Sequence, residues 1–328
     1  MHKFTDKIIC GDCIELLSSV KEPFIDLVFA DPPFNIGYNY DKYKDKLESK
    51  NFIAWTRDWM EACVNALKPG GSFYIAIGDD YAAHIRLLGI ELGLVPRNWI
   101  IWHYTFGQQT KTMFARAHTH ILYFVKDKTN FTYNDLAVRV PSDRQLTYND
   151  KRADRRGKMP DDVWNTYSRV CGTFKEREKW HPCQMPESLL TRIISVSSNE
   201  GDLVLDPFNG SGTTASASLQ LGRKFCGIDI SQNYVDNTRT RLRNLKNQIR
   251  KKDGSSDIFS ARETLEIKRL FIDMALPVKE INASEKLLGL FTQQFEYRMS
   301  NDKTYDQKDI AAALLDFSAW DQKAKSKK

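Results

Sequence analysis

Two short motifs in this sequence place a carboxylate and turn-forming residues directly after an apolar run. The first is Asp31-Pro32-Pro33-Phe34, which follows the apolar stretch 25–30. Ile, Leu, Val and Phe in a short block are typical of a buried strand, and two prolines prevent that strand from continuing. The motif therefore holds a carboxylate, carbonyl oxygens and an aromatic face at the end of a strand, where open α/β sheets bind ligands.

The second motif runs from Asp206 to Thr214 and follows the predicted strand 202–205. Its glycines, Gly210 and Gly212, let the backbone approach a ligand closely, and a helix of small residues comes next. Asp229 lies about 20 residues further on, the usual distance for an acid that bonds ribose hydroxyls. Threonines occupy the stretch where a dinucleotide fold has a third glycine. The pattern predicts a nucleoside ligand without a pyrophosphate.

Together the two motifs suit methyl transfer to an exocyclic amine. The lone pair of such a nitrogen is delocalised into the ring, so the amine is a poor nucleophile. Two acceptors aimed at its N–H groups, the Asp31 carboxylate and the Pro32 carbonyl, would draw the nitrogen toward tetrahedral geometry. Phe34 would hold the base by stacking. The remaining work is positioning and electrostatics, without a covalent intermediate.

The elements that must position these motifs follow from the apolar pattern. Strands are predicted at 7–10, 25–30, 72–77, 99–104, 121–126, 202–205 and 224–230. Helices are predicted from residue 13 and over about 55–67, 81–92, 189–194, 215–221 and 234–250. This alternation predicts a mainly parallel sheet with helices on both faces, in which the strands ending at Asp31 and Asp206 can lie side by side.

The composition is that of an ordinary globular chain. Of 328 residues, 27% are charged and 41% hydrophobic, and the net charge of +6 tilts weakly toward a polyanionic partner. No apolar run approaches the roughly 18 residues of a membrane span. Because the first residues also lack the apolar core of a signal peptide, we expect a cytoplasmic chain that does not enter a membrane.

The cysteines and histidines do not predict a metal site. Cys10 and Cys13 have C-x-x-C spacing, but no second pair completes a zinc site and no thioredoxin-like context surrounds them. His103, His118 and His120 flank predicted strands, as structural histidines commonly do. We therefore expect neither a metal nor a redox centre.

A long segment from about Val138 to Trp180 has no regular periodicity. Its arginines and lysines alternate with Tyr148, Trp164, Tyr167 and other aromatics. Basic residues suit phosphate contacts and aromatics suit base stacking, although a solvated charged loop has a similar composition. The candidates for DNA contact are Arg139, Arg144, Lys151, Arg152, Arg155, Arg156 and Lys158.

The C-terminal part is predicted to be a separate helical region. Residues 251–256 have the composition of a linker, and helical patterns follow around 261–274, 283–295 and 306–317. We expect a catalytic domain at 1–250, with a recognition segment at about 127–180, and an accessory region at 251–328. The accessory region is either a packing or dimer-forming appendage or a clamp on DNA.

The motifs resemble those of the β-class of DNA amino-methyltransferases, in which the catalytic motif precedes the cofactor motif. Gly11-Asp12-Cys13, Lys68-Pro69-Gly70-Gly71 and the segment 181–186 are similar to further motifs of that class. The resemblance covers about residues 8–242. It implies a Rossmann-like S-adenosylmethionine-dependent fold with seven strands and a permuted motif order.

The resemblance also implies the roles of individual residues. Asp31, Pro32, Pro33 and Phe34 are the expected catalytic residues. Asp12 would meet the adenine amine of the cofactor and Asp229 its ribose. The expected cofactor-binding residues are Asp12, Cys13, Asp31, His181, Gln184, Pro186, Asp206, Phe208, Asn209, Gly210, Ser211, Gly212, Thr213, Thr214, Asp229 and Ile230. Phe34 stands where tyrosine is commonest and Met185 where lysine is usual, so one hydroxyl and one polar contact differ from the family pattern.

In that family, Asp before the two prolines usually accompanies N6-adenine and Ser accompanies N4-cytosine. We therefore expect an adenine-N6 methyltransferase acting on a flipped-out base of double-stranded DNA, with N4-cytosine as the alternative. Pro182-Cys183 is reminiscent of C5-cytosine enzymes, but the thiol lacks an evident activating partner. A non-catalytic DNA-binding protein and an RNA or protein amide methyltransferase are rival interpretations. A cognate restriction endonuclease, a homodimer and a nucleoid-associated bacterial or phage-type setting complete the expectations.

Overall fold

A computed structural model describes residues 3–43, 45–108, 110–172 and 174–317 of the chain. The chain divides into two compact units. The larger unit comprises residues 1–133 and 162–246, and the smaller unit comprises residues 134–161 and 247–328. None of the helices in these described ranges is long and apolar enough to span a bilayer.

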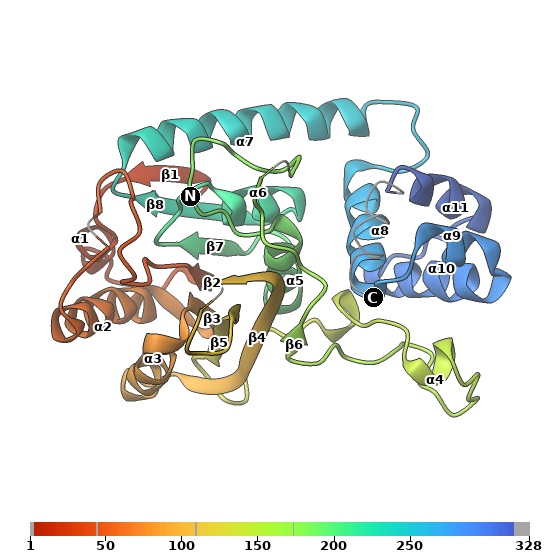
Figure 1. Cartoon of the computed structure of the whole chain (residues 1–328). Coiled ribbons are helices and arrows are strands. Elements are labelled where there is room, and N and C mark those ends of the chain that lie inside the picture. Colours follow the sequence, from red (N-terminus) through yellow and green to blue (C-terminus); the bar gives the residue numbers. More distant parts are fainter. Residues whose placement is uncertain (1–2, 44, 109, 173, 318–328) are drawn as a thin grey trace. The chain divides into compact units, whose positions relative to one another are not determined.

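Within the described residues, the larger unit is built on one eight-stranded sheet with the order β1-β8-β7-β2-β3-β5-β4-β6 (Figure 1). The strands are β1 (Lys7–Cys10), β2 (Ile25–Ala30), β3 (Leu67–Ile77), β4 (Val95–Gln108), β5 (Arg116–Val125), β6 (Val163–Trp164), β7 (Leu203–Asp206) and β8 (Lys224–Asp229). Only β5 runs antiparallel to its neighbours, so the predicted mainly parallel sheet is confirmed. One strand exceeds the expected seven, because β6 is two residues long and leaves no periodic signal.

The two strands that end at the chemical motifs are direct neighbours. Leu27 of β2 pairs with Val204 of β7, and Val28 pairs with Leu205, in parallel register. β8 lies on the other side of β7, and β1 lies beside β8. The carboxyl ends of β1, β8, β7 and β2 therefore meet along one edge of the sheet, as the apolar pattern predicts.

Helices cover both faces of this sheet (Figure 1). One face carries α1 (Cys13–Ser18), α2 (Ser49–Ala66) and α3 (Asp79–Glu91). The other carries α5 (Glu187–Ser197), α6 (Thr213–Gln220) and the first part of α7 (Gln232–Asp253). The apolar residues that α2 repeats at helical spacing, among them Phe52, Trp59 and Met60, are fully buried against the sheet.

The predicted linker begins later than expected. Lys251, Lys252 and Asp253 continue α7, which ends at Asp253, and the N–H of the next residue, Gly254, donates to the Arg250 carbonyl at 3.0 Å. Lysine is a good helix former, so the two lysines at the start of the predicted linker extend the helix and do not interrupt it.

The smaller unit joins the C-terminal helices to an internal segment. It contains η1 (Asp135–Ala137), α4 (Asp143–Leu146), α8 (Ala261–Met274), α9 (Val278–Ala283), α10 (Glu285–Met299) and α11 (Gln307–Leu315). Its core is formed by apolar side chains of α8, α10 and α11, including Ile267, Phe291 and Ile310. The expected division at residue 250, with 127–180 inside the first domain, is therefore corrected: residues 134–161 pack with the C-terminal helices.

Candidate active site

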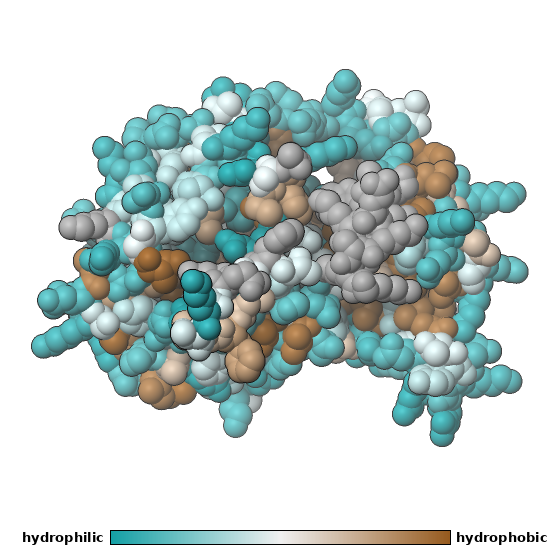
Figure 2. Space-filling view, viewed as in Figure 1, coloured by the Kyte–Doolittle hydropathy of each residue, from teal (hydrophilic) through white to brown (hydrophobic). Residues whose placement is uncertain are grey.

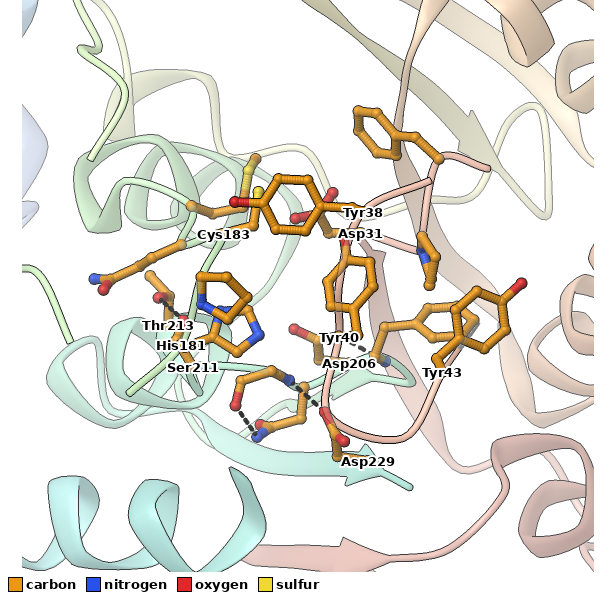
Figure 3. A pocket seen from close by; sticks show the side chains of 18 of the residues that line it. Asp31, Tyr38, Tyr40, Tyr43, His181, Cys183, Asp206, Ser211, Thr213 and Asp229 are labelled. Atoms are coloured by element: carbon orange, nitrogen blue, oxygen red, sulfur yellow. Dashed lines mark hydrogen bonds between the residues drawn. The ribbon is translucent and has the colours of Figure 1, made fainter. Parts of the chain in front are cut away.

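Four aspartates lie where β1, β2, β7 and β8 end. Asp31, Asp206 and Asp229 close or follow their strands directly, and Asp12 follows β1 by two residues. All four line one cavity of about 990 Å³ in the larger unit. Figure 3 shows three of these carboxylates within the same cavity. A parallel sheet brings the ends of its strands together, which explains why residues about 200 positions apart share one site.

Asp31 and Asp206 are enclosed acids without a cationic partner among the described residues. Burial, and after it the neighbouring Asp206 carboxylate, raise the pKa of Asp31 to about 8. Burial raises the pKa of Asp206 to about 7, although the Thr214 hydroxyl at 2.6 Å and the Phe208 N–H at 3.0 Å donate to this carboxylate. A ligand that carries a positive charge would stabilise both acids in their ionised form.

The glycine turn between β7 and α6 is tied to Asp229. The Gly210 N–H donates to one carboxylate oxygen of Asp229 at 2.8 Å, and the Ser231 N–H donates to the other at 2.8 Å. Gly210 has φ +49°, and a Cβ there would lie 2.8 Å from Nε2 of His181. Only glycine therefore lets the turn pass between Asp229 and the histidine.

Most of the predicted site residues line this cavity. They are Asp12, Cys13, Asp31, Pro33, Phe34, His181, Gln184, Asp206, Phe208, Asn209, Gly210, Ser211, Thr213, Thr214, Asp229 and Ile230. Three others have structural positions beside it. Pro32 is buried, Pro186 precedes the first turn of α5, and Gly212 is the left-handed residue that begins α6.

Two of the predicted residues, Gln184 and His181, line the cavity and also support the backbone around it. Both polar atoms of the Gln184 side chain are engaged, with Oε1 accepting from the Glu178 N–H and Nε2 donating to the Glu176 carbonyl, each at 2.8 Å. Burial lowers the pKa of His181 to about 4, so its ring is neutral at physiological pH. Both residues shape the segment that leads into α5.

A second set of cavity residues was not predicted from the sequence. It comes from the loop after Phe34 and from α2 and α7, and it includes Ile36, Tyr38, Tyr40, Tyr43, Trp55 and Tyr234. The loop is held by Asp45, which is only 2% exposed and accepts the N–H groups of Asn35 at 2.6 Å and Tyr38 at 2.9 Å. Three tyrosines within six positions after a strand-end motif are a signal that could have indicated this wall.

The cysteines and histidines around the cavity do not form a further centre. Cys183 lines the cavity, and desolvation of its thiol, followed by the charge of Asp31, raises the thiol pKa to about 11, which keeps the thiol protonated. Methylation of cytosine at C5 requires a thiolate as the attacking nucleophile. In the described ranges, no group of three or more His, Cys, Asp or Glu side chains is arranged to hold a metal ion.

The predicted basic residues of the smaller unit fall into two groups. Arg139 is turned inward, with its side chain 16% exposed, and donates to Asp135 at 2.7 Å and to the Gly157 carbonyl at 2.8 Å. Its guanidinium therefore stabilises the fold of the segment, and a contact of Arg139 with DNA stays a prediction. The exposed residues are Arg144, Lys151, Arg152, Arg155, Arg156 and Lys158.

Comparisons with known proteins agree with this geometry. A family model described as DNA methylase matches residues 25–240. Type II methyltransferase M.HpaI of Haemophilus parainfluenzae is 38% identical over 237 residues, which cover 72% of this chain and 74% of that protein. DNA adenine methyltransferase YhdJ of Escherichia coli is 36% identical over 270 residues, 80% of this chain and 87% of that protein.

Other matches extend the likeness to the C-terminal helices and to the fold. Type II methyltransferase M.BamHI of Bacillus amyloliquefaciens is 31% identical over 329 residues, 95% of this chain and 73% of that protein. The solved structure of the M1.HpyAVI–SAM complex aligns with a TM-score of 0.51 at 22% identity, covering 72% of this chain and 99% of that one. PvuII DNA methyltransferase, described as cytosine-N4-specific, aligns with a TM-score of 0.55 at 19% identity, covering 81% and 92%.

Proposed function

The chain belongs to the N6/N4 family of DNA methylases, and on this premise we propose that it methylates the N6 amine of adenine in double-stranded DNA, with S-adenosyl-L-methionine as the methyl donor. One observation carries the proposal above all others. The Asp31 carboxylate, without a described cationic partner, faces the same cavity as the glycine turn and Asp229.

Two features favour adenine over cytosine. The catalytic motif begins with Asp31, the residue type that usually accompanies adenine in this family, and the relative that matches 80% of the chain is a DNA adenine methyltransferase. The motif itself reads an amine and not a ring, so the N4 amine of cytosine is the alternative substrate. PvuII methyltransferase shares the fold and is cytosine-specific, which makes the identity of the methylated base a direct test.

The residues of the cavity fit the proposed donor. Gly210 and the start of α6 leave room for a close backbone approach, and Asp229 keeps lone pairs free for ribose hydroxyls. Phe208, which packs edge-on against Trp59 with ring centroids 5.1 Å apart, offers an apolar wall. The acids Asp31 and Asp206 suit the positive charge of a sulfonium group. The donor supplies an electrophilic methyl group.

The chain's own residues prepare the amine. The carboxylate of Asp31 and the carbonyl of Pro32 accept hydrogen bonds from the two N–H groups of the target amine, which localises the nitrogen lone pair. Phe34 stacks on the base. The amine loses one proton overall. The positive charge of the bound donor would keep Asp31 ionised, and this carboxylate is our candidate to accept the proton.

Recognition of the duplex is assigned to the smaller unit. Its exposed basic residues, including Arg144, Lys151 and Arg155, would neutralise phosphates and position the duplex. Since the target amine is inaccessible inside a duplex, the base must leave the stack before reaction. A cognate restriction endonuclease, a homodimer and a cytoplasmic, nucleoid-associated setting belong to the same proposal.

The proposal is tested by mapping modified bases in DNA from cells that express the chain. We expect N6-methyladenine at one recognition sequence, and none in cells that express Asp31→Ala. N4-methylcytosine at a fixed sequence would change the substrate to cytosine. Unmodified DNA, with an active close relative as positive control, would favour a non-catalytic DNA-binding protein or an RNA or protein substrate.

A further inference from the structure

The hairpin between β4 and β5 ends in a fully exposed apolar side chain. Phe114 is 99% exposed and Met113 is 61% exposed, the first being the highest value among the exposed large hydrophobic residues of the described chain. The hydrophobic residues visible in Figure 2 are mostly scattered among hydrophilic ones. A phenylalanine held wholly in water lacks the free energy that its burial would provide, and the ring would gain that free energy on contact with a partner.

The tip is anchored and has local structure. The Met113 N–H donates to the Thr110 hydroxyl at 3.1 Å, and that hydroxyl also contacts the Met113 carbonyl. Arg116, two residues after the phenylalanine, forms ion pairs with Asp79 at 3.4 Å and Asp80 at 3.2 Å in the first turn of α3. These contacts fix the base of the tip to the larger unit.

The base of the tip is also part of the active-site wall. Arg116, His118 and Tyr104 from the two hairpin strands line the same cavity as Asp31. Asp79 and Asp80, the partners of Arg116, line it as well. The exposed ring therefore stands within two residues of the cavity in which the target base would react.

From this placement we propose that Phe114, supported by Met113, is an intercalating wedge that enters the duplex beside the target and fills the space left by the flipped base. The inference rests on the proposed function, because an enzyme that acts on an extrahelical base leaves a gap in the stack that such a side chain fills. DNA-bending proteins insert phenylalanine and methionine between base steps in the same manner. Lys111, exposed on the same tip, is available for a phosphate.

A protein partner fits the tip less well than a base stack does. A specific protein interface buries about 800 Å² on each side, whereas this feature offers two apolar side chains beside charged ones. A single aromatic ring matches the gap between two base pairs and can stack on both. The geometry thus favours DNA over a second copy of the chain.

The test compares Phe114→Ala with wild type on two duplexes of the mapped recognition sequence, one fully paired and one with the target base mismatched. We expect kcat/KM of the variant to fall by roughly tenfold or more on the paired duplex, since unstacking is then uncompensated. On the mismatched duplex, where extrusion costs less, the variant should come within about threefold of wild type. Phe114→Trp should retain activity on both.

The control is Leu87→Ala, which removes another exposed apolar side chain, 60% exposed on α3, and should change neither rate. If Phe114→Ala lost kcat/KM equally on both duplexes, or lost none on the paired duplex, the wedge would be overturned. Methylation by wild type in the same experiment would still support the proposed function. If wild type methylated neither duplex, the proposed function would fail and the wedge with it. A change in oligomeric state on Phe114→Ala would assign the tip to a protein contact and contradict the wedge.

Discussion

The two units of this protein differ in the partners of their acidic side chains: two cavity acids of the larger unit have no cationic partner among the described residues, whereas a buried acid of the smaller unit is paired with arginines. In the larger unit, Asp31 and Asp206 line the cavity without a cationic partner in the described residues, and their pKa values rise to about 8 and about 7. In the smaller unit, Glu266 is 1% exposed and pairs with Arg269 and Arg298, the latter at 3.3 Å. Acids without a cationic partner at a cavity wall indicate a binding site for a cationic ligand, whereas buried acids paired with arginines stabilise the fold.

The paired cluster also explains why the C-terminal helices accompany the internal segment. Arg298 on α10 donates to the carbonyls of Arg139 at 3.0 Å and Val138 at 3.2 Å, and it pairs with Asp273 at 2.9 Å. Arg269 donates to the Ala137 carbonyl at 3.1 Å. We infer that these helices support the segment proposed for DNA recognition, which is the packing role among those expected and is distinct from dimerisation and from clamping on DNA.

The largest expected effect comes from breaking the paired cluster. Arg298→Met leaves Glu266 and Asp273 short of a cation in a buried site and should destabilise the smaller unit by about 3–5 kcal/mol. The temperature of thermal unfolding and the affinity for DNA should both fall, while the protein should still bind S-adenosylmethionine. Lys279→Met, which removes an exposed cation of the same unit outside the candidates for DNA contact, is the control for charge alone. Unchanged stability of Arg298→Met would mean that the cluster does not hold the unit together.

A smaller effect is expected at the acid that fastens the glycine turn. Asp229→Asn keeps the size of the side chain but loses a charged acceptor for Gly210, so affinity for S-adenosylmethionine should fall about tenfold, or about 1.4 kcal/mol. Titration calorimetry measures this change. Asp127→Asn is the matched control, because Asp127 accepts from the Thr129 and Asn130 N–H groups outside the cavity. Equal affinities of wild type and Asp229→Asn would remove this residue from the donor site.

The smallest expected effect is a dependence of stability on pH. An acid whose pKa is raised in the folded state binds its proton more tightly there, so its contribution is present at low pH and is lost as pH rises through the folded value. For Asp31 the loss between pH 7 and 8.5 should be about 1 kcal/mol in the protein without ligand. Below about pH 6.5, His181 acts in the opposite direction, since its folded pKa is lowered to about 4.

Chemical denaturation at each pH gives this slope, with Asp31→Asn as the comparison. The stability of that variant should decline much less with rising pH, because it lacks the carboxyl group whose pKa is raised. A slope identical to that of wild type would show that Asp31 does not titrate in this range.

The part of the site that could be predicted lies on local motifs at strand ends. Asp31, Gly210 and Asp229 each follow an apolar run, and a parallel sheet must bring such ends together. Arg298 could not be predicted, because its partners lie between 25 and 160 positions away and have no periodic relation to it. Asp45 could not be predicted either, because its carboxylate accepts the N–H of Asn35 only once the irregular loop between them has folded.

The most direct test of the central claim is to compare activity and stability of Asp31→Asn in the purified protein. If Asp31 is an acid without a cationic partner that serves the chemistry, the substitution should change activity and stability in opposite directions. Methyl transfer to the mapped duplex should fall by about 10²–10³-fold, and the unliganded protein should become more stable by about 1–2 kcal/mol at pH 8. Affinity for S-adenosylmethionine should stay within a few fold of wild type. Near-normal methyl transfer, or a loss of stability in place of a gain, would contradict the account.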